Sequence, residues 1–155
     1  MVFTGLPVTT QRTRFIPDLK DRVSARGPGE DYALGVTEQD VRERGLGERP
    51  LFQALVAHEA GSNDLLGMAV VFEIPYTYHG KPDLFLKELF VTDAALGKGI
   101  GHHLFDGVKA QAKALGCRNL RWLVANWNDD GKAFYSKNGG QREDRWQEWV
   151  CSDLG

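Results

Sequence analysis

The middle of the chain alternates strand-length apolar runs with turn residues, and this pattern constrains the fold more than any other feature. The runs are LFQALVAHE (51–59), LLGMAVVFEI (65–74) and DLFLKELFV (83–91). The turn segments GSND (61–64) and GKPD (80–83) separate them. Apolar runs of this length between such turns are typical of strands joined by tight connections. The middle of the chain therefore predicts an antiparallel meander.

The segment after the meander has the spacing of a helix. Between Gly97 and Leu115 the apolar residues lie one, three or four positions apart, which is the pattern of one buried helical face. These residues are Ile100, Leu104, Phe105, Val108, Ala112 and Leu115. Gly116 follows as the expected stop of the helix.

The remaining pattern predicts a crossover connection. A strand is expected at RNLRWLVAN (118–126), a short helix around 129–137, and a last strand near 143–151. Strand, helix and strand at these lengths imply a parallel crossover attached to the antiparallel meander. We therefore predict an α/β fold of the α+β kind, in which helices flank a mixed, mostly antiparallel central sheet.

The start of the chain has no clear period, because Gly and Pro residues punctuate residues 1–35. A short strand near 8–14 and one or two helical turns within 18–26 are the elements we expect there. Thr37 can cap a helix with acidic residues in its first turn, and this helix is expected to be short because Gly45, Gly47 and Pro50 end it.

Length and charge narrow the class of protein. A chain of 155 residues is one ordinary domain, so we expect a single domain over 1–155. A net charge of -2 gives no basic surface for nucleic acid. No apolar stretch approaches the roughly 18 residues of a membrane span and no leader pattern opens the chain, so a cytoplasmic protein is expected. The two cysteines and four histidines show no metal-ligand spacing.

The segment Gly97-Lys98-Gly99-Ile100-Gly101 is the first candidate for chemistry, because it joins a strand to an amphipathic helix. Glycines at alternate positions let backbone N–H groups point outward at the positive end of the helix dipole, where they can cradle a pyrophosphate. A tight turn that needs glycine dihedral angles explains the segment equally well. A P-loop is excluded because Lys98 is not followed by Ser or Thr, and a dinucleotide fingerprint lacks its acidic residue about 20 positions on.

The second candidate lies about 30 residues downstream, where Trp127-Asn128 precedes Ala133-Phe134-Tyr135 and then Gly139-Gly140. A tyrosine on a helix is most often an amphipathic core residue. Together with the glycine turn, however, these residues resemble the GCN5-related N-acetyltransferase (GNAT) superfamily, whose acetyl-CoA-binding half is similar to residues 86–140.

The resemblance is greatest to the diamine (spermidine/spermine) N-acetyltransferase branch. The residues similar to that branch are Thr37-Glu38, the run GLGERPLF (45–52), Tyr76-Thr77-Tyr78 before the central strand, and Trp127-Asn128 before Tyr135. The resemblance covers about residues 36–150. It implies a splayed central strand in the sheet and a homodimer that exchanges C-terminal strands.

The resemblance also implies a role for individual residues. Backbone groups at the end of the central strand would pair with pantetheine and place the thioester, and the amides of the glycine turn would hold the pyrophosphate. Asn128 would contact the pantetheine arm, Tyr135 would protonate the CoA thiolate, and Glu88 would act as general base. A structural role explains Glu88 equally well, as a solvated or salt-bridged acid on a strand. The cofactor-binding candidates are Leu89, Phe90, Val91, Gly97, Lys98, Gly99, Ile100, Gly101, His102, Asn128 and Tyr135.

Acceptor-binding candidates are Glu88, Tyr76 and Tyr78. The two tyrosines can wall an amine pocket through cation–π contacts, or simply place one ring inward and one outward along a strand.

Three positions depart from the family pattern. Leu96 stands where the superfamily usually has Arg or Gln, so one donor near the phosphates is missing. The diamine branch commonly has two adjacent acids where this chain has Lys87-Glu88, and the lysine would repel a polycation. Residues 1–35 do not match the usual first strand and long first helix, so this segment is either atypical or poorly ordered.

These observations predict an N-acetyltransferase that moves the acetyl group of acetyl-CoA directly to a primary amine of a small molecule, without a metal. A diamine, a polyamine or an amino-acid-like amine is the expected acceptor. Two alternatives stay open: an enzyme of the same fold that acts on a protein N-terminus or an aminoglycoside, and a non-catalytic acyl-CoA-binding module.

Overall fold

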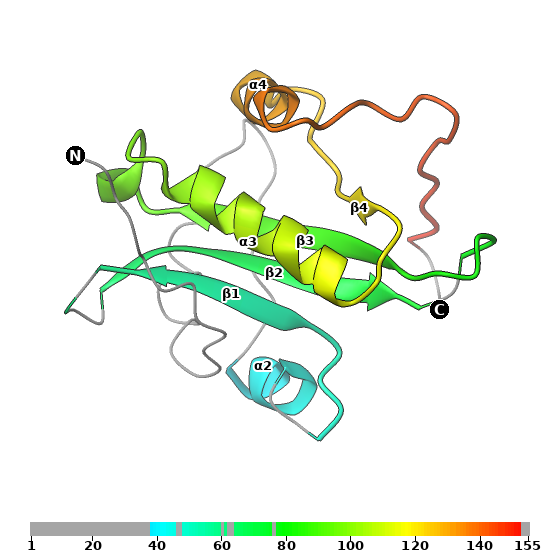
Figure 1. Cartoon of the computed structure of the whole chain (residues 1–155), viewed down its shortest axis with the longest axis horizontal. Coiled ribbons are helices and arrows are strands. Elements are labelled where there is room, and N and C mark those ends of the chain that lie inside the picture. The colour runs from blue at the N-terminus through cyan, green and yellow to red at the C-terminus, as the bar shows by residue number, and fades with distance from the viewer. Residues whose placement is uncertain (1–37, 46–47, 60, 62–63, 76, 153–155) are drawn as a thin grey trace. The chain divides into compact units, whose positions relative to one another are not determined.

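The computed structural model describes residues 38–45, 48–59, 61, 64–75 and 77–152. Its sheet has the strand order β1-β2-β3-β4 (Figure 1). The first two pairings are antiparallel and the last is parallel, so the predicted mixed sheet is confirmed. The strands are β1 (Gln53–His58), β2 (Leu65–Ile74), β3 (Asp83–Val91) and β4 (Leu120–Arg121). The helices are α2 (Glu38–Gly45), the 3-10 helix η1 (Asp93–Ala95), α3 (Ile100–Ala114) and α4 (Asp129–Lys137).

Contacts within the chain gather into two compact units, Met1–Trp122 and Leu123–Gly155. The sheet, α2 and α3 belong to the first unit, and α4 belongs to the second. The single domain expected over 1–155 stays a prediction.

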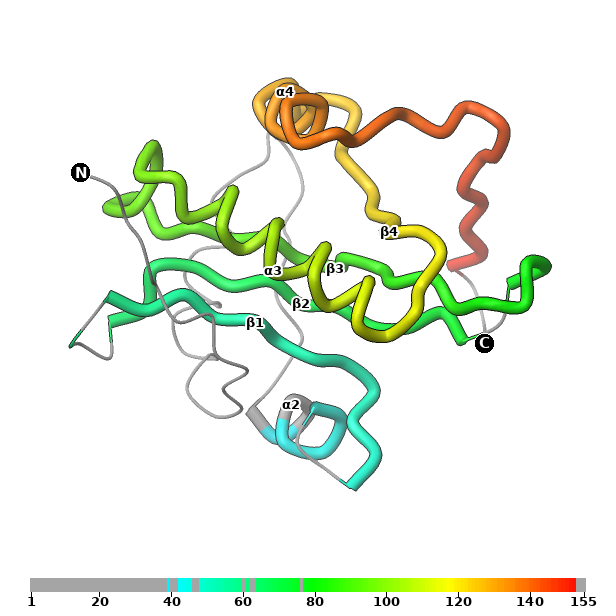
Figure 2. The backbone as a smooth tube through the Cα atoms, in the orientation of Figure 1, coloured from blue at the N-terminus to red at the C-terminus, as the bar shows by residue number. Residues whose placement is uncertain are grey.

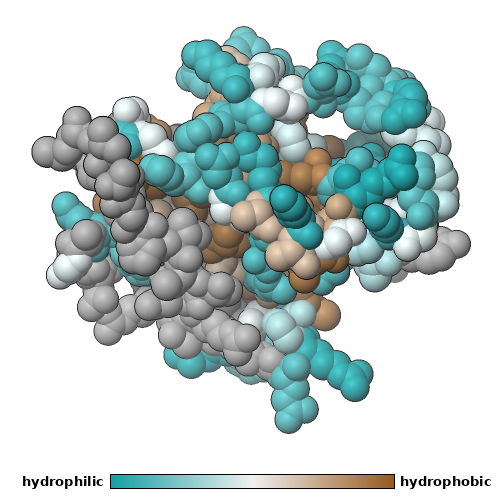
Figure 3. Space-filling model, viewed as in Figure 1, coloured by the Kyte–Doolittle hydropathy of each residue, from teal (hydrophilic) through white to brown (hydrophobic). Residues whose placement is uncertain are grey.

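Helix α3 covers one face of the sheet, as the tube in Figure 2 also shows. The predicted apolar face is buried at Ile100, Leu104, Phe105, Val108 and Ala112. A Cβ atom on Gly67 would lie 3.0 Å from Cδ1 of Leu104, so Gly67 faces this helix. In Figure 3, which views the molecule as Figure 1 does, hydrophilic residues cover much of the face and hydrophobic residues show between them.

The alternation along β2 assigns each face of the sheet. Because Gly67 faces α3, Ala69 and Val71 face it as well, and both are buried. Met68 between them is also buried, so both faces of β2 are covered. Phe72 lies on the face away from α3 and stacks on Phe85 of β3, with ring centroids 5.1 Å apart.

A buried carboxylate joins the start of β3 to β4. Asp83 accepts hydrogen bonds from the backbone N–H of Asn119 at 3.2 Å and from its side-chain Nδ2 at 3.0 Å. Arg121 forms an ion pair with the second oxygen of Asp83 at 3.7 Å. These contacts support the parallel pairing of Leu84 with Leu120 and of Phe85 with Arg121.

Two sequence predictions for the C-terminal part are wrong. The strand expected over 118–126 is only Leu120–Arg121, and no strand forms over 143–151. Residues 141–152 are exposed throughout, so their backbone has no partner strand among the described residues. Trp146 and Trp149 are three positions apart, which does not match the two-residue period of a strand.

At the N-terminal side, α2 is short as predicted and ends at Gly45, the first of the residues expected to stop it. The proposed cap Thr37, the strand near 8–14 and the helical turns within 18–26 lie outside the described residues. Among the helices that the structure describes, none is both long enough and apolar enough to cross a membrane.

Candidate active site

The end of β3 has one unpaired edge. β3 runs to Val91, but its pairing with β4 in the described structure involves only Leu84 and Phe85. From Leu86 onward the backbone groups on that edge have no strand beside them within the described residues, while β2 continues to pair on the other side. The splayed central strand that the resemblance implied is therefore present, and it includes the candidates Leu89, Phe90 and Val91.

A β-bulge in β3 decides which face of the sheet carries Glu88. Leu86 pairs with Val71, and Glu88 pairs with the next residue of β2, Val70, so Lys87 is the extra residue. Leu86 shares the α3 face with its partner Val71. Strict alternation from Leu86 would place Glu88 on that face too, whereas pairing with Val70 turns it to the opposite face.

The surroundings of Glu88 change its acidity. Burial raises the pKa of the Glu88 carboxyl group above its usual value, and the positive charge of Lys87 offsets part of that rise. The side chain still reaches solvent, so the rise comes from partial desolvation. A carboxylate with a raised pKa holds a proton more strongly and is the better general base near neutral pH.

The glycine segment that follows β3 is a tight turn at the N-terminus of α3. Gly97 and Gly99 have φ angles of 73° and 81°, in the left-handed region that favours glycine. The first helical hydrogen bond runs from the His103 N–H to the Gly99 carbonyl at 3.1 Å, so the amides of Ile100 and Gly101 precede the helical ladder. A Cβ atom on Gly97 or Gly99 would meet nothing within 4 Å, so the turn borders open space.

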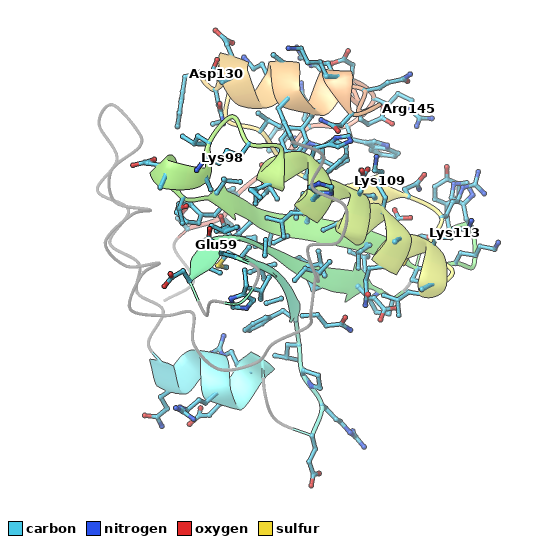
Figure 4. All side chains as sticks on the ribbon, turned by 60° about the vertical axis from the view of Figure 1, so that its left-hand side comes forward. Glu59, Lys98, Lys109, Lys113, Asp130 and Arg145 are labelled. Carbon is cyan, nitrogen blue, oxygen red and sulfur yellow. The ribbon has the colours of Figure 1, made fainter. Side chains whose placement is uncertain are left out.

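The charges around this turn suit an anion. The first turn of α3 contains no acidic residue that would neutralise the positive end of its dipole. Lys98 is exposed on the turn, whereas Lys109 and Lys113 lie further along α3 (Figure 4). Leu96, which stands where the resemblance expects a donor, has 51% of its surface exposed. The predicted glycine turn at the N-terminus of a helix is confirmed, and its use as a phosphate cradle stays a prediction.

The His102 side chain turns along α3 toward Asp106, at 3.2 Å. Asp106 also pairs with Lys109 at 2.7 Å, and this hydrogen bond is the main reason why the pKa of Asp106 lies below its usual value. The candidate contact of His102 with phosphate is therefore a contact of its backbone amide.

In the second unit, Asn128 begins α4 and Tyr135 lies within it. The side-chain oxygen of Asn128 accepts a hydrogen bond from the Gly131 N–H at 2.8 Å, which makes Asn128 the N-cap of the helix. Tyr135 is half-buried, and its ring contacts that of Phe134 edge to face with centroids 5.2 Å apart. The predicted helix over 129–137 is confirmed at both ends.

The glycine pair after α4 ends the helix. Gly139 has a φ of 86°, and the Gly140 N–H donates to the Tyr135 carbonyl at 2.8 Å. The Gly139 N–H donates to the Ser136 carbonyl at 3.2 Å, which completes a Schellman motif. The motif fixes the backbone at Tyr135.

The acceptor-binding candidates are not all brought together. Tyr78 is 80% exposed and lies in the turn before β3, where its ring meets that of His79. Glu88 lies five positions after the first residue of β3. At a rise of about 3.3 Å per residue, this places Glu88 about 17 Å along the strand from the turn that holds Tyr78. Tyr76 lies outside the described residues, and Tyr135 and Glu88 belong to different units.

Sequence reasoning missed the bulge in β3. Two adjacent charged residues, Lys87 and Glu88, interrupt an apolar strand, and this break in alternation was the available signal. Within the described residues no three His, Cys, Asp or Glu side chains group in a way that holds a metal ion.

Known proteins resemble this chain in sequence and in fold. The model of the acetyltransferase (GNAT) family matches residues 21–140. Thialysine N-epsilon-acetyltransferase of Mus musculus is 27% identical over 125 residues, which are 77% of this chain and 73% of that protein. Spermidine/spermine N(1)-acetyltransferase-like protein 1 of Homo sapiens is 30% identical over 112 residues, 69% of this chain and 16% of that protein.

An aminoglycoside N-acetyltransferase solved in complex with CoA has the same fold, with a TM-score of 0.63 and 18% identity over 76% of this chain and 80% of that one. The family model spans the sheet, the glycine turn of α3 and the helix that carries Tyr135. The chain therefore belongs to the acetyltransferase (GNAT) family and is an N-acetyltransferase.

Proposed function

We propose that the chain transfers the acetyl group of acetyl-CoA to a primary amine of a small molecule while both substrates are bound. The amine nitrogen attacks the thioester carbonyl carbon, so that a C–N bond forms and the C–S bond breaks. One proton leaves the ammonium of the acceptor before attack, the same nitrogen loses a second proton as the amide forms, and the CoA thiolate gains one. The products are an acetylated amine and free CoA.

The continuous segment Leu86–Gly101 carries this proposal. It contains an unpaired strand edge, then a turn with two left-handed glycines, then a helix N-terminus without an acidic residue. An extended pantetheine arm can pair with the strand edge at Leu89–Val91. A pyrophosphate further along the same molecule can then accept hydrogen bonds from the amides of Gly97–His102, with Lys98 beside it.

Two groups manage the protons in this proposal. Glu88 takes the proton of the acceptor ammonium, directly or through water, and its raised pKa favours that task. Tyr135 donates a proton to the departing thiolate, and Asn128 contacts the pantetheine arm. Much of the rate enhancement comes from holding the amine against the thioester.

The named relatives support an amine acceptor, because one is a thialysine N-epsilon-acetyltransferase. The neighbour solved with CoA supports acetyl-CoA as co-substrate. We also propose, from the resemblance alone, that the chain is a cytoplasmic homodimer. Light scattering on the purified chain tests the dimer.

Calorimetry with acetyl-CoA, followed by a thiol-release screen over amines, tests the proposed reaction. We expect acetyl-CoA to bind and at least one small primary amine to release CoA. Initial rates should give intersecting double-reciprocal lines, which indicate a ternary complex. Parallel lines contradict direct transfer, and absence of binding at millimolar acetyl-CoA overturns the proposal.

A further inference from the structure

The β-bulge places two opposite charges side by side on one face of β3. Lys87 follows Leu86, which faces α3, so alternation turns Lys87 to the other face. Glu88 lies on that same face because it pairs with Val70. Consecutive Cα atoms are about 3.8 Å apart. A regular strand would have sent these two neighbouring side chains to opposite faces.

Most neighbours of this pair on the same face are apolar. They are Ala54 and Val56 of β1, Met68, Val70 and Phe72 of β2, and Phe85 and Phe90 of β3. Asp83 is the other charged residue of β3 on this face, and Asn119 and Arg121 already occupy its carboxylate. Lys87 and Glu88 are therefore the charges that β3 offers to a ligand here.

Lys87 and Glu88 do not neutralise each other. Both are exposed, and neither forms an ion pair within the part of the chain that the structure describes. Lys87 does act on Glu88 through space, because its charge lowers the pKa of the carboxyl group against the effect of burial. A ligand with one ammonium and one carboxylate would satisfy both side chains.

Resting on the proposed acetyl transfer, we propose that Lys87 is a specificity-determining residue that binds the carboxylate of the acceptor. The acceptor is then a zwitterionic amine of the amino-acid class, with its reacting nitrogen at Glu88. A polyamine would instead bring a second ammonium next to the Lys87 ammonium. At separations of about 4 Å this repulsion corresponds to about tenfold or more in affinity.

Matched acceptors test this inference directly. L-lysine and 1,5-diaminopentane have the same five-carbon diamine and differ by the carboxylate, and L-ornithine and 1,4-diaminobutane form a second pair. We expect the kcat/KM of the wild-type chain to be about tenfold or more higher for each amino acid than for its diamine. Lys87→Gln should raise KM for the amino acids more than KM for the diamines, with little change in KM for acetyl-CoA.

Lys87→Glu should reverse the preference, because it presents two carboxylates to the diamine and repels the amino acid. Lys81→Gln is the matched control, since Lys81 is exposed in the turn before β3 and its replacement removes the same charge. Lys81→Gln should leave kcat/KM unchanged for both the amino acids and the diamines. Thermal denaturation of each variant checks that the exposed substitutions leave the fold intact.

The outcomes separate this inference from the proposed function. Release of CoA with diamines as efficient as with amino acids, and unaffected by Lys87→Glu, overturns the role of Lys87 while acetyl transfer stands. Absence of transfer to every amine, despite a folded chain, overturns the proposed function and this inference together.

Discussion

Gly67 approaches the backbone of Phe90 so closely that a Cβ atom on Gly67 would lie 2.6 Å from the Phe90 carbonyl oxygen. The same atom would lie 3.0 Å from Cδ1 of Leu104. Only glycine therefore lets the end of β3 and Leu104 of α3 both lie this close to β2. This contact places the strand edge that we propose for pantetheine.

Gly67→Ala should displace the end of β3. We expect the free energy of unfolding to fall by about 1 to 3 kcal/mol, because overpacking of a close contact destabilises a protein by about this amount. The KM for acetyl-CoA should rise as well, since Phe90 and Val91 move. Denaturant titration and initial rates measure the two effects. An unchanged midpoint and an unchanged KM would show that the contact relaxes without cost.

Glu88→Gln should make the chain more stable at neutral pH and less active. The folded-state pKa of Glu88 is raised, so the folded state binds more protons and stability falls as pH rises from 4.5 through that pKa. Glutamine removes this penalty. The gain in melting temperature should be present at pH 7 to 8 and should vanish toward pH 4.

The activity of Glu88→Gln gives a second readout. Loss of the base should lower kcat about 100-fold or more and remove the acidic limb of the kcat/KM profile. Glu73→Gln is the control, because it neutralises an exposed carboxylate on β2. If both variants show the same pH profile as the wild-type chain, Glu88 is not the base.

Local pattern was enough to predict much of the fold. The bounds of β2 and β3 match the predicted ranges because turn residues flank each strand, and the bounds of α4 match its predicted range as well. The buried face of α3 also follows directly from the spacing of Leu104, Phe105 and Val108. Each of these features depends on residues close together in the sequence.

Features that depend on a distant partner were missed. The bulge at Lys87 is defined by the register between β3 and β2, and the adjacent charges in β3 were only a local sign of it. The strand expected over 143–151 has no partner strand among the described residues. The capping bond of Asn128 was also missed, although Asn before an acidic first turn is a usual N-cap signal.

Gly99→Ala separates the phosphate turn from simple backbone strain. The left-handed φ of Gly99 makes alanine cost about 1 to 2 kcal/mol of stability. The added methyl group would also project into the open space proposed for the pyrophosphate, so KM for acetyl-CoA should rise. Gly116→Ala is the matched control, because Gly116 has a φ of 69° with open space at the C-terminal end of α3. An equal KM for acetyl-CoA in both variants would show that the turn at Gly99 does not bind the phosphates.

Leu96→Arg should strengthen acetyl-CoA binding. Leu96 is half-exposed immediately before the glycine turn, so arginine can reach a bound phosphate without disturbing the core. We expect KM for acetyl-CoA to fall by up to about fivefold, since an exposed ion pair contributes up to about 1 kcal/mol. The gain should shrink as salt is raised. Leu96→Gln should give a smaller gain that salt does not change, and no gain from either variant would place the phosphates elsewhere.

Tyr135→Phe tests the general acid by comparing two acetyl donors that differ in their leaving group. Removing the hydroxyl group should lower kcat with acetyl-CoA about 100-fold. This is the low end of the usual contribution of a general acid, because a thiolate already leaves fairly well without protonation. Transfer from p-nitrophenyl acetate should change little, because its leaving group departs without protonation. Ser136→Ala removes a hydroxyl from the neighbouring exposed position of α4 and should affect neither donor. An equal loss with both donors would mean that Tyr135 shapes the site and donates no proton to the thiolate.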